Sequence, residues 1–200
     1  DKYLDQMTVE ELASQISDMF GTPEVSSVAK PAFSEGDGTA NVGANTFPEE
    51  YGDTRDVCLY PCSVVAACMW NNDRLTRRGE LMAEEALYCK LPLFWAGGGN
   101  LHRTPFGGRN GEYFSEDAIL TNLYTTTELT AVQSRGVTPG IKHVAGNDQE
   151  FHREGLVVFF NEQAFREQAL RAFEGALSNE NTMALMQSFN RLGLVWASSS

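Results

Sequence analysis

Residues 136–153 read GVTPGIKHVAGNDQEFHR, and this stretch decides how the rest of the sequence is interpreted. The apolar residues 136–141 are typical of a short buried strand, so Lys142 and His143 come where the strand ends and a loop begins. In α/β folds functional groups collect at that end of the strands. The loop that follows is dense in hydrogen-bonding groups, as a site for sugar hydroxyls requires. A solvated loop with one core histidine is the alternative interpretation.

A second segment, residues 100–117, reads NLHRTPFGGRNGEYFSED and has the pattern of a functional loop. Its glycines permit close backbone approaches that a side chain would prevent. Arg109 offers a rigid fork of donors for a carboxylate or a diol, although an ion pair with Glu112 or Asp117 is the alternative for it. Glu112 is expected to orient an arginine rather than act as an acid. Ser115 is predicted to be the N-cap of the next helix.

Hydrophobic patterning predicts strands that alternate with helices. Thr8 and Glu11 form a capping-box pattern at the start of a helix that runs to about Phe20. Further helices are expected over residues 63–70, 73–89, 115–135 and 161–178, with strands near 28–33 and over 91–95, 137–144 and 182–186. This alternation implies βα units and a mostly parallel sheet, hence an α/β fold in one domain.

The two motifs resemble those of glycoside hydrolase family 3, the β-glucosidase-like enzymes. Residues 161–167, NEQAFRE, and residues 186–191, MQSFNR, are similar to two further motifs of the family, and all four occur in its order. The resemblance implies a (β/α)8 TIM-barrel type of fold. Because a complete barrel usually needs about 250 residues, we expect residues 1–200 to be the N-terminal part of such a barrel domain, incomplete in this chain.

The same resemblance implies a sugar-binding half-site. The aspartate of the family's S-D-G-P-x-G loop corresponds to Asp37 in residues 34–39, SEGDGT, for which a plain Asp-Gly turn is the alternative. The residues expected to surround the sugar with it are Arg109, Lys142, His143 and Arg153. No catalytic residue is expected in the chain, since the family's nucleophile and acid/base would lie beyond residue 200.

Composition limits the partners. A net charge of −12 argues against nucleic acid or an anionic membrane surface as a partner, and no apolar run is long enough to span a membrane. Three histidines and four cysteines without C-x-x-C spacing favour no metal. Cys58 and Cys62 could pair, but buried free thiols and a cytoplasmic location are the interpretation we prefer.

These observations predict a retaining exo-β-glycosidase that removes terminal non-reducing β-D-glucosyl or similar residues without a cofactor. A non-catalytic sugar-binding fragment or module is the alternative. The loop at residues 145–147 disfavours the N-acetylglucosaminidases of the family, which carry K-H-F-P-G-H-G. An open barrel would leave apolar faces of residues 137–141 and 183–186 partly uncovered. The oligomeric state cannot be predicted.

Overall fold

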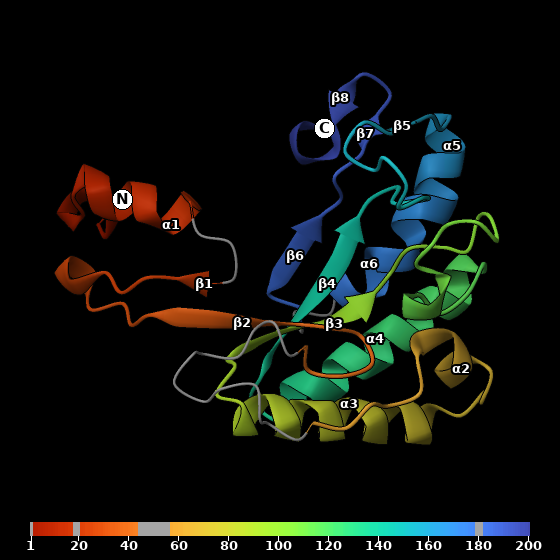
Figure 1. Cartoon of the computed structure of the whole chain (residues 1–200), viewed down its shortest axis with the longest axis horizontal. Helices are drawn as coiled ribbons and strands as arrows, with labels where there is room; N and C mark the ends of the chain where they lie inside the picture. Colours follow the sequence, from red (N-terminus) through yellow and green to blue (C-terminus); the bar gives the residue numbers. More distant parts are fainter. Residues whose placement is uncertain (1, 18–20, 44–56, 179–181) are drawn as a thin grey trace.

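The computed structural model describes residues 2–17, 21–43, 57–178 and 182–200. At its centre is a five-stranded sheet in the order β1-β2-β3-β4-β6 (Figure 1). Four strands are parallel, and β1 pairs with β2 in the antiparallel direction at one edge. The strands are β1 (Gly21–Thr22), β2 (Phe33–Asp37), β3 (Leu93–Gly98), β4 (Thr138–Val144) and β6 (Ala184–Gln187). The result is part of a barrel of the (β/α)8 type.

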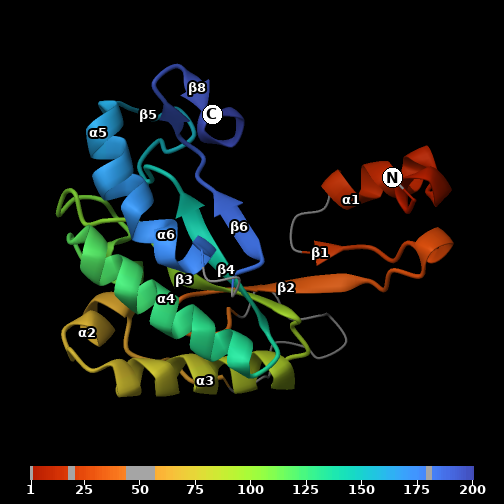
Figure 2. The same ribbon diagram turned by 180° about the vertical axis from the view of Figure 1, so that it is seen from behind.

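Three helices pack behind this sheet: α3 (Asn72–Tyr88), α4 (Ala118–Ser134) and α6 (Arg171–Ser178), seen from the rear in Figure 2. Strand β3 is buried along its whole length, as expected of a parallel strand covered on both faces. The core between sheet and helices centres on Phe94, Leu129 and Ile141, all fully buried. The helices thus fix the strands from behind and leave their carboxyl ends open.

Shorter elements complete the fold. The chain opens with η1 (Leu4–Gln6) and α1 (Val9–Ser17), which project with β1 from the rest of the molecule (Figure 1). A three-stranded sheet forms from β5, β7 and β8 near the C-terminus. The remaining bounds are η2 (Ser26–Val28), α2 (Ser63–Ala67), η5 (Asn110–Glu112), β5 (Val157–Val158), α5 (Glu162–Ala164), η6 (Phe165–Leu170), β7 (Arg191–Leu192), β8 (Val195–Trp196) and η7 (Ala197–Ser199). Within the described residues no helix is both long and apolar enough to cross a membrane.

Local signals account for most of these boundaries. The capping box is confirmed: the Glu11 carboxylate accepts from the Thr8 amide at 2.9 Å, and the Thr8 hydroxyl accepts from the Glu11 amide at 3.1 Å. The predicted end of that helix at Phe20 lies outside the described residues. Ser115 was the wrong N-cap. Asp117 is extended and accepts from the Leu120 amide at 2.7 Å, whereas the Ser115 hydroxyl caps only the Asp117 amide.

The strand predicted near residues 28–33 is displaced and covers Phe33–Asp37 instead. Residues 26–28 form a 3-10 turn, and Ala29 is left-handed at φ 55°, so the chain is not extended there. Apart from an isolated bridge between Val25 and Lys30, pairing starts only after Pro31, which has no amide hydrogen to contribute to a ladder. This shift moves Glu35 and Asp37 from a presumed loop onto a strand.

The sequence predicts that an open barrel leaves residues 137–141 and 183–186 partly uncovered, and the structure agrees for only one of these two segments. Met183 is 76% exposed and Leu185 is 42% exposed, as predicted for residues 183–186. Val137 and Ile141 are buried, because α4 and α6 cover the other face of β4. The prediction for residues 137–141 was therefore wrong.

Within the described residues the cysteines form no disulfide, but only one of the four is fully buried. Cys89 is buried, Cys62 is half-buried, and Cys58 and Cys68 are exposed. The preferred interpretation of four buried thiols was therefore wrong for Cys58 and Cys68.

A buried ion pair joins the two longest helices. Arg78 on α3 binds Glu128 on α4, and their side chains are 4% and 0% exposed. Burial raises the pKa of the Glu128 carboxyl, and the arginine opposes that effect. Two charges taken out of water are tolerated only together, since either one alone is left uncompensated. No local sequence pattern marks this pair, because its members lie in different helices.

We expect Arg78→Met to lower the free energy of unfolding by about 3–5 kcal/mol, because it leaves Glu128 buried without a partner. The matched control is Arg77→Met on the same helix. Arg77 pairs with Glu80 but is 52% exposed, so its loss should cost at most about 1 kcal/mol. Urea unfolding of the full-length protein measures both values, and equal losses for the two variants would contradict the role of the buried pair.

Candidate functional site

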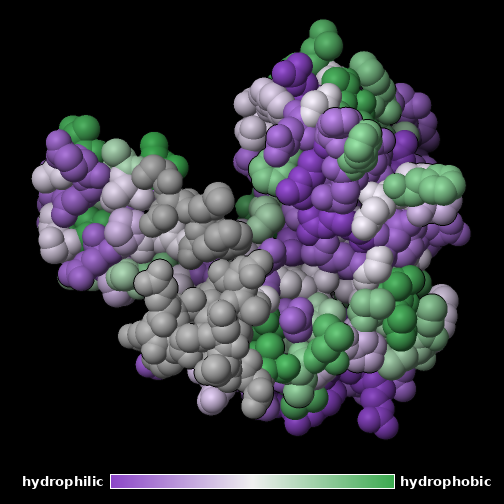
Figure 3. All heavy atoms as spheres, viewed as in Figure 1, coloured by the Kyte–Doolittle hydropathy of each residue, from purple (hydrophilic) through white to green (hydrophobic). Residues whose placement is uncertain are grey.

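A cavity of about 830 Å³ opens at the carboxyl ends of the parallel strands. Strand register brings these ends together, since Asp37 is opposite Trp95, Gly98 is opposite Lys142, and Lys142 is opposite Met186. In Figure 3 hydrophilic side chains gather around the upper ends of β4 and β6. The sheet therefore collects polar groups from distant parts of the sequence at one edge.

The structure brings the five predicted sugar-binding residues into one place. Four of them line the cavity: Asp37, Arg109, His143 and Arg153. Lys142 lies beneath them, and only 1% of its side chain is exposed. It is therefore placed to hold other site residues and does not itself line the cavity.

The Lys142 ammonium binds two carboxylates. Its Nζ donates to Asp37 Oδ1 at 2.5 Å and lies 2.8 Å from Glu112 Oε1. A buried ammonium needs such partners because the lost hydration is otherwise uncompensated. Asp37 Oδ1 also accepts from the Gly38 amide at 2.9 Å. The Asp37 side chain is 44% exposed, so its Oδ2 can accept from a ligand.

Carboxylates also hold the two arginines of the site. Arg109 Nε lies 2.5 Å from Glu112 Oε2, and Arg153 lies 2.9 Å from Glu150 Oε2. Glu150 also faces Arg109 at 3.5 Å, so it links the pair. The ion pair weighed as the alternative for Arg109 thus exists, in an arginine that also lines the cavity.

Glu112 orients Arg109 as predicted. Burial alone would raise the pKa of the Glu112 carboxyl, but the hydrogen bond from Arg109 and the charge of Lys142 bring that pKa below its usual value. Burial alone would lower the pKa of Arg109, and its hydrogen bond to Glu112 raises that pKa instead. Both groups stay charged, so Glu112 is not available as a proton donor.

His143 is held as a neutral hydrogen-bonding group. The Tyr113 hydroxyl oxygen accepts from Asn147 at 2.8 Å and lies 3.1 Å from His143 Nδ1. Burial, followed by the charges of Arg109 and Lys142, lowers the pKa of His143 to about 2. The ring is therefore neutral at neutral pH, with one donor and one acceptor nitrogen for hydrogen bonds.

Sequence interpretation missed the floor of the cavity. Trp95 Nε1 donates to Glu35 Oε2 at 2.8 Å, and both residues line the cavity. A Cβ at Gly140 would meet Trp95 Cε3 at 2.2 Å, so the indole ring needs a glycine on the neighbouring strand. The available signal was alternation along β2, which puts Glu35 on the same side as Asp37. Because the strand was predicted near residues 28–33, this alternation was not recognised.

Aromatic side chains form another part of the cavity wall, and sequence interpretation missed these too. Phe189 and Trp196 line the cavity. The Arg153 guanidinium lies 4.6 Å from the Phe189 ring centre, and Arg191 lies 4.3 Å from that of Trp196. The cavity therefore has a polar wall that suits hydroxyl groups and an aromatic wall that suits the apolar face of a ring.

The loops that carry these residues bind each other. The Glu150 amide donates to the Gly107 carbonyl at 3.0 Å, and Gly108 has φ +87° where it passes Glu150. Arg103 lies 2.5 Å from Asp148 and over the Phe160 ring, so it joins the loop to residues 148 and 160. The glycines of this loop thus serve a close approach.

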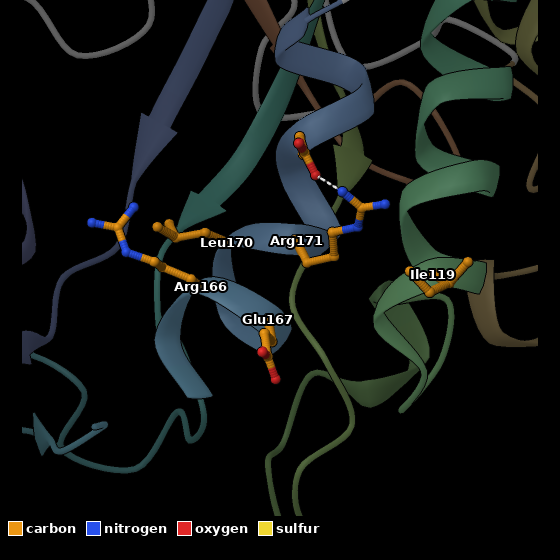
Figure 4. A pocket seen from close by; sticks show the side chains of 6 residues that line it. Ile119, Arg166, Glu167, Leu170 and Arg171 are labelled. Atoms are coloured by element: carbon orange, nitrogen blue, oxygen red, sulfur yellow. Dashed lines mark hydrogen bonds and ion pairs between the residues drawn. The ribbon is translucent and has the colours of Figure 1, made fainter. Parts of the chain in front are cut away.

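A second hollow is lined by residues of α4, η6 and α6 (Figure 4). It is lined by Ile119, Arg166, Glu167, Leu170, Arg171 and Glu174. Its arginines pair with neighbouring carboxylates, Arg171 with Glu174 and Arg166 with Glu162. Such exposed pairs are typical of a solvated helix surface, so the strand-end cavity is the candidate site.

Comparisons with known proteins show the family to which the chain belongs. The family described as glycosyl hydrolase family 3 N terminal domain matches residues 49–200. Thermostable β-glucosidase B of Acetivibrio thermocellus is 30% identical over 96% of the chain and 26% of its own length. A β-glucosidase of Rhizobium radiobacter is 30% identical over 99% of the chain and 24% of its own length. The chain thus spans about a quarter of the length of these relatives.

Among solved structures, β-glucosidase 3B of Thermotoga neapolitana in complex with glucose superposes with a TM-score of 0.89. It is 31% identical to the chain, and the match covers 98% of the chain and 30% of that structure.

The depressed pKa of His143 predicts acid sensitivity. The unfolded chain binds a proton near the ordinary histidine pKa of about 6.5, whereas the folded chain does so only near 2. The contribution of the neutral His143 ring to the free energy of unfolding is therefore present above pH 6.5 and is lost as the pH falls from there toward 2. His143→Gln should remove about 1.4 kcal/mol of this dependence per pH unit between pH 6.5 and 5. Urea unfolding at several pH values measures it.

The control is His152→Asn, at an exposed position with φ 54° that asparagine tolerates. It should leave the pH dependence unchanged. A His143→Gln variant with the same pH profile as the unmodified protein would show that the ring is protonated in the folded state.

Proposed function

Because the chain belongs to glycoside hydrolase family 3, we propose that the protein is a retaining exo-β-glycosidase that acts on terminal non-reducing β-D-glucosyl residues. The observation that carries the proposal is the Asp37 carboxylate, fixed on a buried ammonium with one oxygen open to the cavity. Such a group selects a ligand that donates hydrogen bonds. The comparison structure in complex with glucose supports a glucoside as the substrate.

In this proposal the chain supplies the binding half of the site. Asp37 accepts from sugar hydroxyls, His143 forms hydrogen bonds through its neutral ring, and Arg109 and Arg153 donate from the other side. Contacts that strengthen as the sugar ring gains oxocarbenium character would contribute to the rate. The aromatic wall of Phe189 and Trp196 would contact the apolar faces of the substrate.

We propose that the catalytic carboxylates lie outside these 200 residues. Retaining hydrolysis needs a nucleophile and an acid/base about 5–5.5 Å apart. Asp37, which lines the cavity, and Glu112, which does not, are both ion-paired with Lys142. The length of the relatives leaves ample sequence for both groups, since the chain covers only 26% and 24% of two of them.

A non-catalytic sugar-binding module is the second candidate. The observation that favours it is the same engagement of Asp37 and Glu112 in ion pairs, which suits binding and leaves neither poised as a proton donor. Such a module would bind glucose and turn over no glucoside.

We expect Asp37→Asn to weaken the binding of glucose or gluconolactone by about 1.5–3 kcal/mol, the scale of a hydrogen bond to a charged group. Titration calorimetry on the full-length protein measures the dissociation constant. Glu162→Gln is the control, since this 78% exposed carboxylate pairs with Arg166 on the surface and should leave binding unchanged. An unchanged constant for Asp37→Asn would show that the Asp37 carboxylate does not bind the sugar.

We expect His143→Ala to lower kcat/KM for an aryl β-glucoside by about 10²–10³-fold, as the loss of a transition-state hydrogen bond does. Lys142→Ala should lower it on the same scale, because Asp37 loses its counter-charge. Steady-state kinetics on the full-length protein test both. Glucose binding without any turnover in the unmodified protein would favour the module over the enzyme.

A further inference from the structure

The loop that follows Asp37 is held from behind the sheet. Pairing between β2 and β3 reaches only to Asp37 and Trp95, so the residues after Asp37 depend on other bonds. The guanidinium of Arg78, on helix α3, donates through one terminal nitrogen to the Thr39 carbonyl. Thr39 is buried and lies two residues from Asp37. A charged side chain on an outer helix thus reaches the backbone beside the proposed sugar-binding carboxylate.

The contacts of Arg78 fix where that carbonyl lies. Its Nε donates to the Pro61 carbonyl at 3.0 Å, and its other terminal nitrogen binds Glu128. Because the guanidinium is planar with donors in fixed directions, three acceptors define its position and plane. Glu128 is fully buried on α4. The position of Thr39 is therefore set from two helices and the segment at Pro61.

The loop transmits this position to Asp37. The Gly43 amide donates to the Asp37 carbonyl at 2.7 Å and closes the loop over residues 37–43. Gly38 has φ +148°, and a Cβ there would meet the Asn41 carbonyl oxygen at 1.9 Å. A loop this tight has little room to adjust, so a shift at Thr39 moves Asp37.

Stability alone does not account for a charged pair at this place. Apolar side chains of similar size often replace a buried ion pair with no loss of stability, because the desolvation cost disappears. Apolar side chains cannot, however, donate to the carbonyls of Thr39 and Pro61. These donated bonds are what the arginine adds.

We propose that Arg78 is a positioning residue for Asp37: it fixes the loop over residues 37–43 so that the Asp37 carboxylate stands between Lys142 and the sugar. The proposal rests on the proposed function of Asp37 in sugar binding. It assigns part of the affinity to a residue that does not line the cavity.

The test replaces both charges at once, Arg78→Leu with Glu128→Leu, so that neither is left buried alone. The expected result is a protein that still unfolds cooperatively, with glucose binding weakened about tenfold, part of the bond made by Asp37. The same pair is then made in the Asp37→Asn background. If Arg78 acts through Asp37, the two effects are not additive, and the pair should change binding by less than about twofold there.

The other outcomes of these binding measurements would contradict the proposed role of Arg78. The proposal would be overturned if the double replacement weakened glucose binding equally in the unmodified protein and in Asp37→Asn, or in neither. Arg78 would then act elsewhere or only in folding. Loss of binding in Asp37→Asn with none in the double replacement would overturn this inference alone. Unchanged binding in Asp37→Asn would overturn the proposed function, and this inference with it.

A second variant covers the case in which the double replacement does not fold. Arg78→Lys keeps a charge beside Glu128 but cannot donate to three acceptors in one plane. Arg78→Lys is made with and without Asp37→Asn, and it should change glucose binding in each background as the double replacement does. Arg77→Gln with Glu80→Gln removes an exposed pair from the same helix, and it should leave glucose binding unchanged in both backgrounds.

Discussion

The buried ammonium of Lys142 is the constraint on which the candidate site depends. A charge at the end of β4, removed from water, costs several kcal/mol unless carboxylates approach it. Asp37 and Glu112 do so from two other segments of the chain. Glu112 in turn holds Arg109, and Glu150 links Arg109 to Arg153. One desolvated charge thus orders a network that extends across the mouth of the partial barrel.

The electrostatics of this network differ from those of the whole molecule. The chain carries a net charge of −12, yet its site contains three cationic side chains, each paired with carboxylates. His143 adds no charge, because burial lowers its pKa to about 2. Every one of these cations is therefore engaged by a carboxylate, and Glu35 and Glu154 add two further carboxylates to the lining. Such a site suits a neutral polyhydroxylated ligand better than an anion, which would compete with the carboxylates for the cations.

Some features of the structure could be predicted from the sequence and others could not. Helices with strong periodicity, such as Asn72–Tyr88, lie within a few residues of their expected bounds, and the motif residues at the strand ends meet as their order implied. The Arg78–Glu128 pair carries no local signal, since its partners lie fifty residues apart. Glu35 was missed because β2 begins later than its apolar residues indicated. Pairings between distant segments, which the sequence does not display, decide both cases.

The contact between Trp95 and Gly140 links the evolutionary histories of two strands. A methyl group at residue 140 would occupy the space of the indole ring, 2.2 Å from Cε3. A larger residue at position 140 would therefore have to be replaced by glycine before position 95 could accept a tryptophan. Gly140 in turn cannot be replaced by a larger residue while Trp95 is present. Among descendants of this sequence the two positions are expected to covary, with the order of substitution imposed by the volume of one aromatic ring.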